Sequence, residues 1–216
     1  MKYDLLIFDW DGTLCDSTGR IVDSMQQAAR ENALRAVPDS AVQNIIGLGL
    51  PEAIRTVWPE IQDEQMVPMK GAYARYFLTD SLVGMGLFAG AVELLSRQQG
   101  LRRLAVATGK SRKGLNRVLS DLDVGSYFIA TRCADETRSK PDPLMLEQIL
   151  SETGVPVERA LMIGDTSFDL DMANAAGMDS VAMSHGAHDE AVLLACRPKA
   201  ICHSISELSD WIEQYG

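Results

Sequence analysis

The sequence is poor in cysteine and has neither a concentration of positive charge nor a long apolar run. Its four cysteines are widely spaced and form no C-x-x-C pair, which argues against a disulfide scaffold. Lys and Arg number 20 against 30 Asp and Glu, a formal net charge of −10, and no basic cluster stands out. Nucleic acid and membrane surfaces are therefore not expected as partners.

The amino terminus has no recognisable targeting segment. The apolar run before Asp9 is too short and too acidic for a signal peptide, and no stretch approaches the roughly 20 apolar residues of a membrane span. With the reduced cysteines, this predicts a cytoplasmic protein. Of the 216 residues, 46% are hydrophobic and 23% charged, a globular composition long enough for a sizeable core and a second small domain.

Short β-rich runs alternate with helical patterns over the second half of the chain. This alternation predicts an α/β fold, a Rossmann-like parallel sheet with helices on both faces. A first strand at 4–8 has the same apolar character. The later strands are expected at 103–107, 127–130, 160–163, 180–183 and 200–202, and the helices at 111–121, 143–153, 169–176, 189–195 and 206–214.

Nearly a hundred residues separate the first strand from the next clear one, which indicates an insertion. Its patterns predict helices at 17–36, 40–46, 51–58 and 64–79. We therefore expect a core domain of residues 1–15 and 89–216 and a helical cap domain of residues 16–88.

Polar residues follow four of the expected strands, at the edge where an open parallel sheet binds ligands. Converging carboxylates repel one another unless a cation or a shared proton relieves them, and their all-oxygen character favours Mg²⁺ over Zn²⁺. With a lysine and backbone N–H groups beside them, such carboxylates suit phosphoryl transfer, in which one carboxylate can be the nucleophile. The four segments are Asp9-Trp10-Asp11-Gly12-Thr13, Thr108-Gly109-Lys110, Lys140-Pro141-Asp142-Pro143 and Gly164-Asp165-Thr166-Ser167-Phe168-Asp169.

In this order the four segments resemble the motifs of the haloacid dehalogenase superfamily, specifically the group similar to phosphoglycolate phosphatases with a helical cap between motifs one and two. The resemblance implies that Asp9 is the nucleophile and Asp11 the general acid and base. It implies that Thr108 and the N–H of Gly109 bind the phosphoryl oxygens. The cofactor that it implies is Mg²⁺.

The same resemblance assigns the remaining site residues. Lys140 would neutralise the phosphate and the nucleophile. The metal would be held by Asp9, by Asp165 and, through its main-chain carbonyl, by Asp11, with Asp169 supporting the metal or Lys140. The expected activity is hydrolysis of a small, phosphoglycolate-like phosphomonoester by a monomer or weak homodimer.

Several alternatives stay open at this stage. A pyrophosphatase, or a nucleotide or sugar-phosphate phosphatase, would use the same groups. The resemblance disfavours a phosphomutase, because the mutases of this superfamily generally carry Val after the motif-one glycine and a histidine in the first cap helix. Here Thr13 follows that glycine, and no histidine precedes His185. A non-catalytic binding protein is disfavoured by the intact Asp9. In the cap, Arg20 and Arg55 are candidate contacts to an anionic substrate tail, the loop 47–52 is expected to face the active site, and Asp16 is assigned to the hinge.

Overall fold

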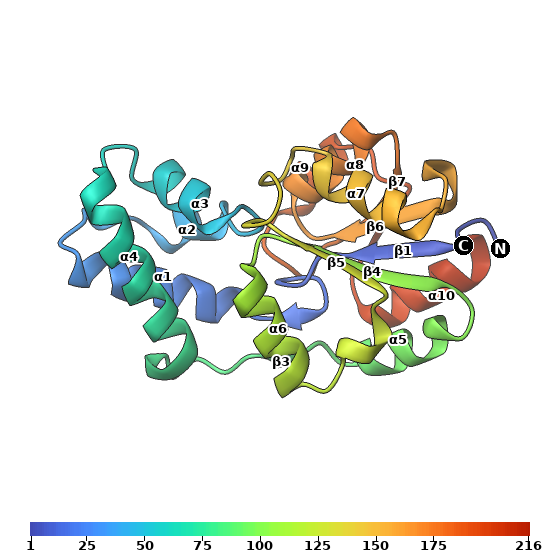
Figure 1. Ribbon diagram of the computed structural model, residues 1–216, viewed down its shortest axis with the longest axis horizontal. Coiled ribbons are helices and arrows are strands. Elements are labelled where there is room, and N and C mark those ends of the chain that lie inside the picture. Colours follow the sequence, from blue (N-terminus) through green and yellow to red (C-terminus); the bar gives the residue numbers. More distant parts are fainter.

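A six-stranded parallel sheet forms the larger lobe of the molecule (Figure 1). The computed structural model describes the backbone of residues 1–216 and every side chain except that of residue 80. The strand order is β5-β4-β1-β6-β7-β8. The strands β4 and β5 therefore lie on one side of β1, and the later strands β6, β7 and β8 lie on the other side. This confirms the expected Rossmann-like α/β fold. The strands are β1 (Leu5–Phe8), β4 (Arg103–Thr108), β5 (Ala130–Cys133), β6 (Ala160–Gly164), β7 (Asp179–Met183) and β8 (Ala200–Cys202).

Helices cover both faces of this sheet because successive side chains of its buried strands point to opposite sides. In β1, Leu6 and Phe8 belong to one apolar cluster, whereas Leu5 and Ile7 belong to another. The first cluster includes apolar side chains of α5 (Ala91–Gln99), α6 (Arg112–Asp121) and α10 (Ile205–Tyr215), which cover one face of the sheet. The second contains α7 (Leu144–Thr153) and α8 (Ser167–Ala176), and α9 (Glu190–Ala195) packs beside α8.

A smaller helical lobe lies beyond the carboxyl end of β1 (Figure 1). Its helices surround an apolar core of their own, which includes Met25, Ile54, Trp58 and Met69. Two short antiparallel strands, β2 (Cys15–Asp16) and β3 (Gly86–Leu87), pair where the chain enters and leaves this lobe. The helices are α1 (Thr18–Glu31), α2 (Asp39–Gln43), α3 (Leu50–Val57) and α4 (Asp63–Arg75), and a π-helix covers Tyr76–Asp80.

Two of the expected elements were placed wrongly. The strand expected at 127–130 begins only at Ala130, and a 3-10 helix occupies Gly125–Tyr127, with Tyr127 packed against the core. The helix expected to reach residue 36 ends at Glu31, because Ala33 has a φ of 53° and the Leu34 N–H bonds the Ala29 carbonyl at 3.0 Å. None of the described helices is long and apolar enough to cross a membrane.

Candidate active site

The candidate nucleophile, Asp9, follows β1 directly, at the point in the sheet where the strand order reverses. The Asp9 N–H donates to the Ile163 carbonyl at 2.9 Å. This bond fixes Asp9 beside the carboxyl end of β6. The chain then turns sharply: Gly12 has a φ of 81°, and its N–H bonds the Cys15 carbonyl at 2.8 Å. A Cβ at Gly12 would overlap the Asp165 carboxylate, so this close approach requires glycine.

Lys140 lies between two carboxylates in the interior. Its Nζ is 2.8 Å from Asp9 Oδ1 and 2.6 Å from Asp169 Oδ1, and all three side chains are at most 1% exposed. Burial alone would lower the pKa of Lys140, but Asp169 and Asp9 outweigh it, and the pKa is raised. The lysine is therefore a permanent cation beside the candidate nucleophile.

Negative charge at the site still exceeds what Lys140 balances. Burial raises the pKa of Asp9 to about 7; Lys140 opposes this, and Asp169 adds to it. Burial likewise raises the pKa of Asp165 well above its usual value, with the charge of Asp9 adding to the effect. Three buried carboxylates with one lysine thus leave the region short of positive charge.

These carboxylates fit a cation. Asp9, Asp165 and Asp169 each place one ligand oxygen within 4.8 Å of the others. Asp169 Oδ2 is occupied by the Thr166 hydroxyl at 2.7 Å, and the Asp165 oxygens accept from Thr13 Oγ1 at 2.6 Å and from the Ala187 N–H at 2.8 Å. Apart from the ion pair with Lys140, the buried Asp9 oxygens have no hydrogen-bond partner among the described residues. The free ligand capacity is greatest at Asp9, and hard oxygen donors suit Mg²⁺.

The Asp11 carboxylate lies outside this three-carboxylate group and is held from a different side. Ser17 Oγ donates to Asp11 Oδ1 at 2.6 Å, and Lys110 Nζ lies 2.9 Å from the same oxygen. The Lys110 ammonium also lies over the Phe77 ring, 4.7 Å from its centre. Whether the main-chain carbonyl of Asp11 contributes to a metal site stays a prediction.

Thr108 ends β4 beside this group, and Gly109 follows it directly. Thr108 is fully buried and its hydroxyl accepts from the Lys110 N–H at 3.2 Å. Gly109 faces the helical lobe so closely that a Cβ there would be 2.5 Å from the carbonyl oxygens of both Gly47 and Leu48. The turn after β4 therefore contacts the loop that was expected to face the site.

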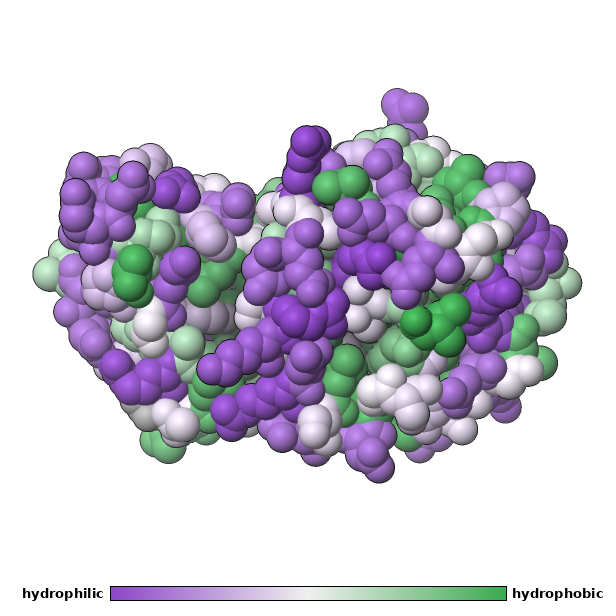
Figure 2. All heavy atoms as spheres, viewed as in Figure 1, coloured by the Kyte–Doolittle hydropathy of each residue, from purple (hydrophilic) through white to green (hydrophobic). Residues whose placement is uncertain are grey.

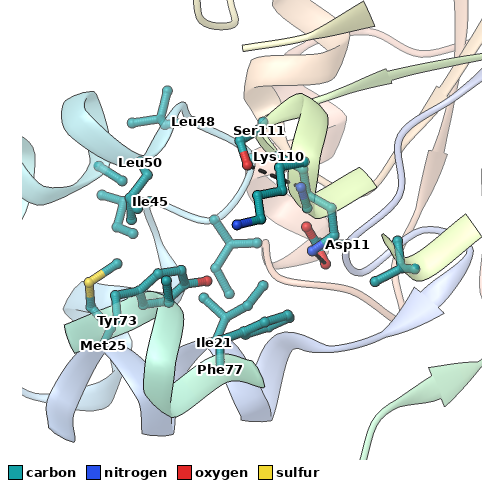
Figure 3. A pocket seen from close by; sticks show the side chains of 18 of the residues that line it. Asp11, Ile21, Met25, Ile45, Leu48, Leu50, Tyr73, Phe77, Lys110 and Ser111 are labelled. Carbon is teal, nitrogen blue, oxygen red and sulfur yellow. Dashed lines mark hydrogen bonds and ion pairs between the residues drawn. The ribbon is translucent and has the colours of Figure 1, made fainter. Parts of the chain in front are cut away.

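A cavity of about 290 Å³ opens above these residues, between the two lobes (Figure 3). Asp9, Asp11 and Gly109 line it from the sheet side, and Gly47 and Leu48 line it from the loop. The site thus combines a buried carboxylate, a second carboxylate two positions later and a sheltered space for a substrate.

The two candidate cap contacts, Arg20 and Arg55, are directed away from the cavity. Arg20 donates to the main-chain carbonyls of Val83, Phe77 and Ser81, and so ties α1 to the end of the helical lobe. Arg55 pairs with Asp63 at 2.9 Å on the exposed surface. Neither arginine lines the cavity.

Sequence reasoning missed the contacts of Lys110, Ser17 and Thr13 with the site carboxylates. Lys110 was placed in the polar segment Thr108-Gly109-Lys110, but no role was assigned to it. Its position two residues after the end of β4 was the available signal, because that turn lies at the ligand edge of the sheet. Ser17 and Thr13 carry no comparable signal, since hydroxyl residues near a turn are common.

The order and geometry of this site can be compared with known proteins. The family model described as haloacid dehalogenase-like hydrolase matches residues 6–183. A phosphoglycolate phosphatase of Rhodospirillum rubrum is 28% identical over 96% of this chain and 90% of its own length. The "Probable phosphatase IndB" of Dickeya dadantii is 33% identical over 94% of this chain and 91% of its own.

The fold agrees with the sequence match. A structure described as a predicted phosphoglycolate phosphatase from Haemophilus somnus superposes with a TM-score of 0.88 at 20% identity, covering 100% of this chain and 99% of that one. The family match includes β1, β4, β6 and the carboxylates that follow β1 and β6. This chain therefore belongs to the haloacid dehalogenase-like hydrolases.

Proposed function

We propose that this protein is a Mg²⁺-dependent phosphatase that hydrolyses a small phosphomonoester through an aspartyl phosphate on Asp9. The observation that carries the proposal is the Asp9 carboxylate, which is buried, contacts Lys140, has no other hydrogen-bond partner among the described residues and lines the cavity. Such a carboxylate is positioned to attack a phosphorus atom bound there.

In the first step, an Asp9 oxygen forms a bond to phosphorus while the bond from phosphorus to the leaving oxygen breaks. Asp11 donates a proton to that oxygen. In the second step, Asp11 takes a proton from water, the water oxygen attacks phosphorus, and the Asp9–phosphorus bond breaks. Lys110 and Ser17 fix the Asp11 carboxylate for both transfers.

The remaining residues hold the phosphate and balance its charge. We assign the phosphoryl contacts to Thr108, to the N–H of Gly109 and to Lys140. Asp9 and Asp165, with the main-chain carbonyl of Asp11, would hold Mg²⁺, and Asp169 orients Lys140. Bound there, Mg²⁺ supplies charge neutralisation for the phosphoryl oxygens.

We further propose that residues 16–88 act as a cap that shields the reaction from bulk water. The sequence favoured a phosphoglycolate-like substrate, and the name of the Rhodospirillum rubrum relative supports it. Phosphoglycolate is therefore the first compound to assay.

The test is Asp9→Asn, assayed by release of inorganic phosphate with Mg²⁺ present. We expect turnover to fall by roughly 10³-fold or more, since removing a nucleophile removes the covalent route. Wild-type protein quenched in cold acid during turnover should carry a phosphoryl group that alkali or hydroxylamine removes, and Asp9→Asn should carry none.

The matched control is Asp16→Asn, in the same stretch of chain but exposed and outside the cavity lining. It should retain turnover. Near wild-type turnover by Asp9→Asn, from protein free of background phosphatase, would rule out the proposal.

A further inference from the structure

The helical lobe presents an uncharged wall to the cavity. Among the side chains that the structure describes, none that lines the cavity from residues 16–88 carries a charge. This wall, which we call the cap wall, includes Ile21, Met25, Ile45, Leu48, Leu50 and Phe77 (Figure 3). A substrate bound at Asp9 would place the group attached to its phosphate against this wall.

One hydroxyl interrupts the apolar character of the cap wall. Tyr73 points its hydroxyl into the cavity (Figure 3), and no described residue hydrogen-bonds it. Burial raises the pKa of the Tyr73 phenol well above its usual value, and the charge of Asp11 adds to this. The hydroxyl therefore stays protonated and offers the substrate one neutral donor.

The basic side chains of the lobe that were candidates for an anionic substrate are directed elsewhere. Arg20 is held by three main-chain carbonyls, and Arg55 is paired with Asp63. A second anionic group on the substrate would lose its hydration on binding against the cap wall. Because the cap wall offers no cation in return, this desolvation would cost free energy.

The cations on the opposite wall of the cavity do not pair with a second anionic group of the substrate either. Lys110 is paired with Asp11 and lies over Phe77. Lys113 and Arg117 of α6 line the cavity but are exposed to solvent, and Arg117 pairs with Asp121. Both belong to α6 of the larger lobe, from which they can attract an anionic substrate out of solution, whereas the cap wall itself carries no charge.

From this arrangement we infer that the substrate is a phosphomonoester whose leaving group is uncharged and largely apolar, of about the size of one six-membered ring. The inference rests on the proposed phosphatase function and narrows its substrate class away from phosphoglycolate. The cavity of about 290 Å³ is roughly twice the ~150 Å³ of a cavity that binds benzene, so a phosphate and one ring fit together.

The first experiment compares benzyl phosphate with phosphoglycolate. Both are esters of primary alcohols, so the comparison does not depend on an activated aryl leaving group. For the wild type with Mg²⁺, we expect kcat/KM for benzyl phosphate to be at least about ten-fold higher, since even one methylene in an apolar pocket can change selectivity ten-fold.

The same pair is compared by calorimetric binding to Asp9→Asn, which separates substrate preference from turnover. Tighter binding of benzyl phosphate supports the inference even if the wild type hydrolyses neither ester, a result that would remove only the proposed function. Equal or tighter binding of phosphoglycolate overturns the inference even if both esters are hydrolysed.

A variant that adds a cation to the cap wall tests the mechanism of this selectivity. Ala74 is an exposed residue of α4 that lines the cavity, so Ala74→Lys adds the charge without burying it. We expect the preference for benzyl phosphate to fall by about ten-fold or more relative to wild type.

Gly71→Lys is the matched control. It adds the same charge on the same helix, where a Cβ meets no atom within 4 Å and the residue does not line the cavity. Its selectivity should equal that of the wild type. An unchanged preference in Ala74→Lys, with a wild-type melting temperature, would contradict the role of the cap wall.

Discussion

Lys140 balances two buried carboxylates, which makes it a structural residue as well as a candidate catalytic one. Its Nζ contacts both Asp9 and Asp169 where solvent does not reach. Removing one partner of a buried ion pair leaves an uncompensated buried charge. The free-energy cost of that charge is larger than the net stabilisation that the pair provides. We therefore expect Lys140→Met to lower the free energy of unfolding by about 3 kcal/mol or more, measured by urea denaturation.

Lys199→Met is the control for this prediction. Lys199 pairs with Asp179 at 3.0 Å, but its side chain is 51% exposed, so the loss should be within about 1 kcal/mol. Equal losses in the two lysine variants would show that the interior charges are already balanced without Lys140.

At the scale of elements, the turn after β4 lies in close backbone-to-backbone contact with the loop between α2 and α3. A Cβ at Gly109 would be 2.5 Å from two carbonyl oxygens of that loop, and backbone cannot yield as a flexible side chain can. Gly109→Ala should displace the loop from the site. We expect kcat/KM for a small phosphomonoester to fall by about 100-fold, because a misplacement of about 1 Å has that effect.

The circular dichroism spectrum of Gly109→Ala should remain that of the wild type, since the strand itself is not altered. Gly71→Ala is its control, because a Cβ at Gly71 meets nothing within 4 Å. Wild-type kcat/KM in Gly109→Ala would mean that the loop moves without consequence for the reaction.

The elements that carry the candidate site were predictable because their signal is local. β1, β4 and β6 are apolar runs followed directly by polar turns, and parallel strands bring those turns to one edge. β5 was less predictable, because it is an edge strand containing Arg132, whereas a 3-10 helix at Gly125–Tyr127 occupies the start of the expected strand.

Other elements depend on partners far along the chain. Neither α5 nor the β2–β3 pair was predicted, and β2 is only two residues long, with a partner about 70 positions away. The role of Arg20 was missed for the same reason: the carbonyl that its Nε donates to belongs to Val83. No local pattern specifies which way such a side chain turns.

On the scale of the whole molecule, the site lies where the two lobes meet, and the chain termini lie at the other end. Figure 2 shows that the outer face of both lobes is mostly hydrophilic in this view, in contrast to the apolar cap wall inside. At the far end of the sheet, the Tyr3 N–H donates to the Gly216 carbonyl at 3.0 Å (Figure 1). Tags at either terminus should therefore leave the cavity unobstructed.

Mg²⁺ should stabilise the folded molecule, because folding assembles the Asp9, Asp165 and Asp169 carboxylates, which repel one another. A ligand bound only by the native state at 100 times its Kd adds about 2.7 kcal/mol, roughly 5–10 °C in Tm for a chain of this size. Asp165→Asn should lose most of this shift, measured by calorimetry, whereas Asp171→Asn, exposed on α8, should keep it. A shift of equal size in both variants would show that Mg²⁺ binds elsewhere.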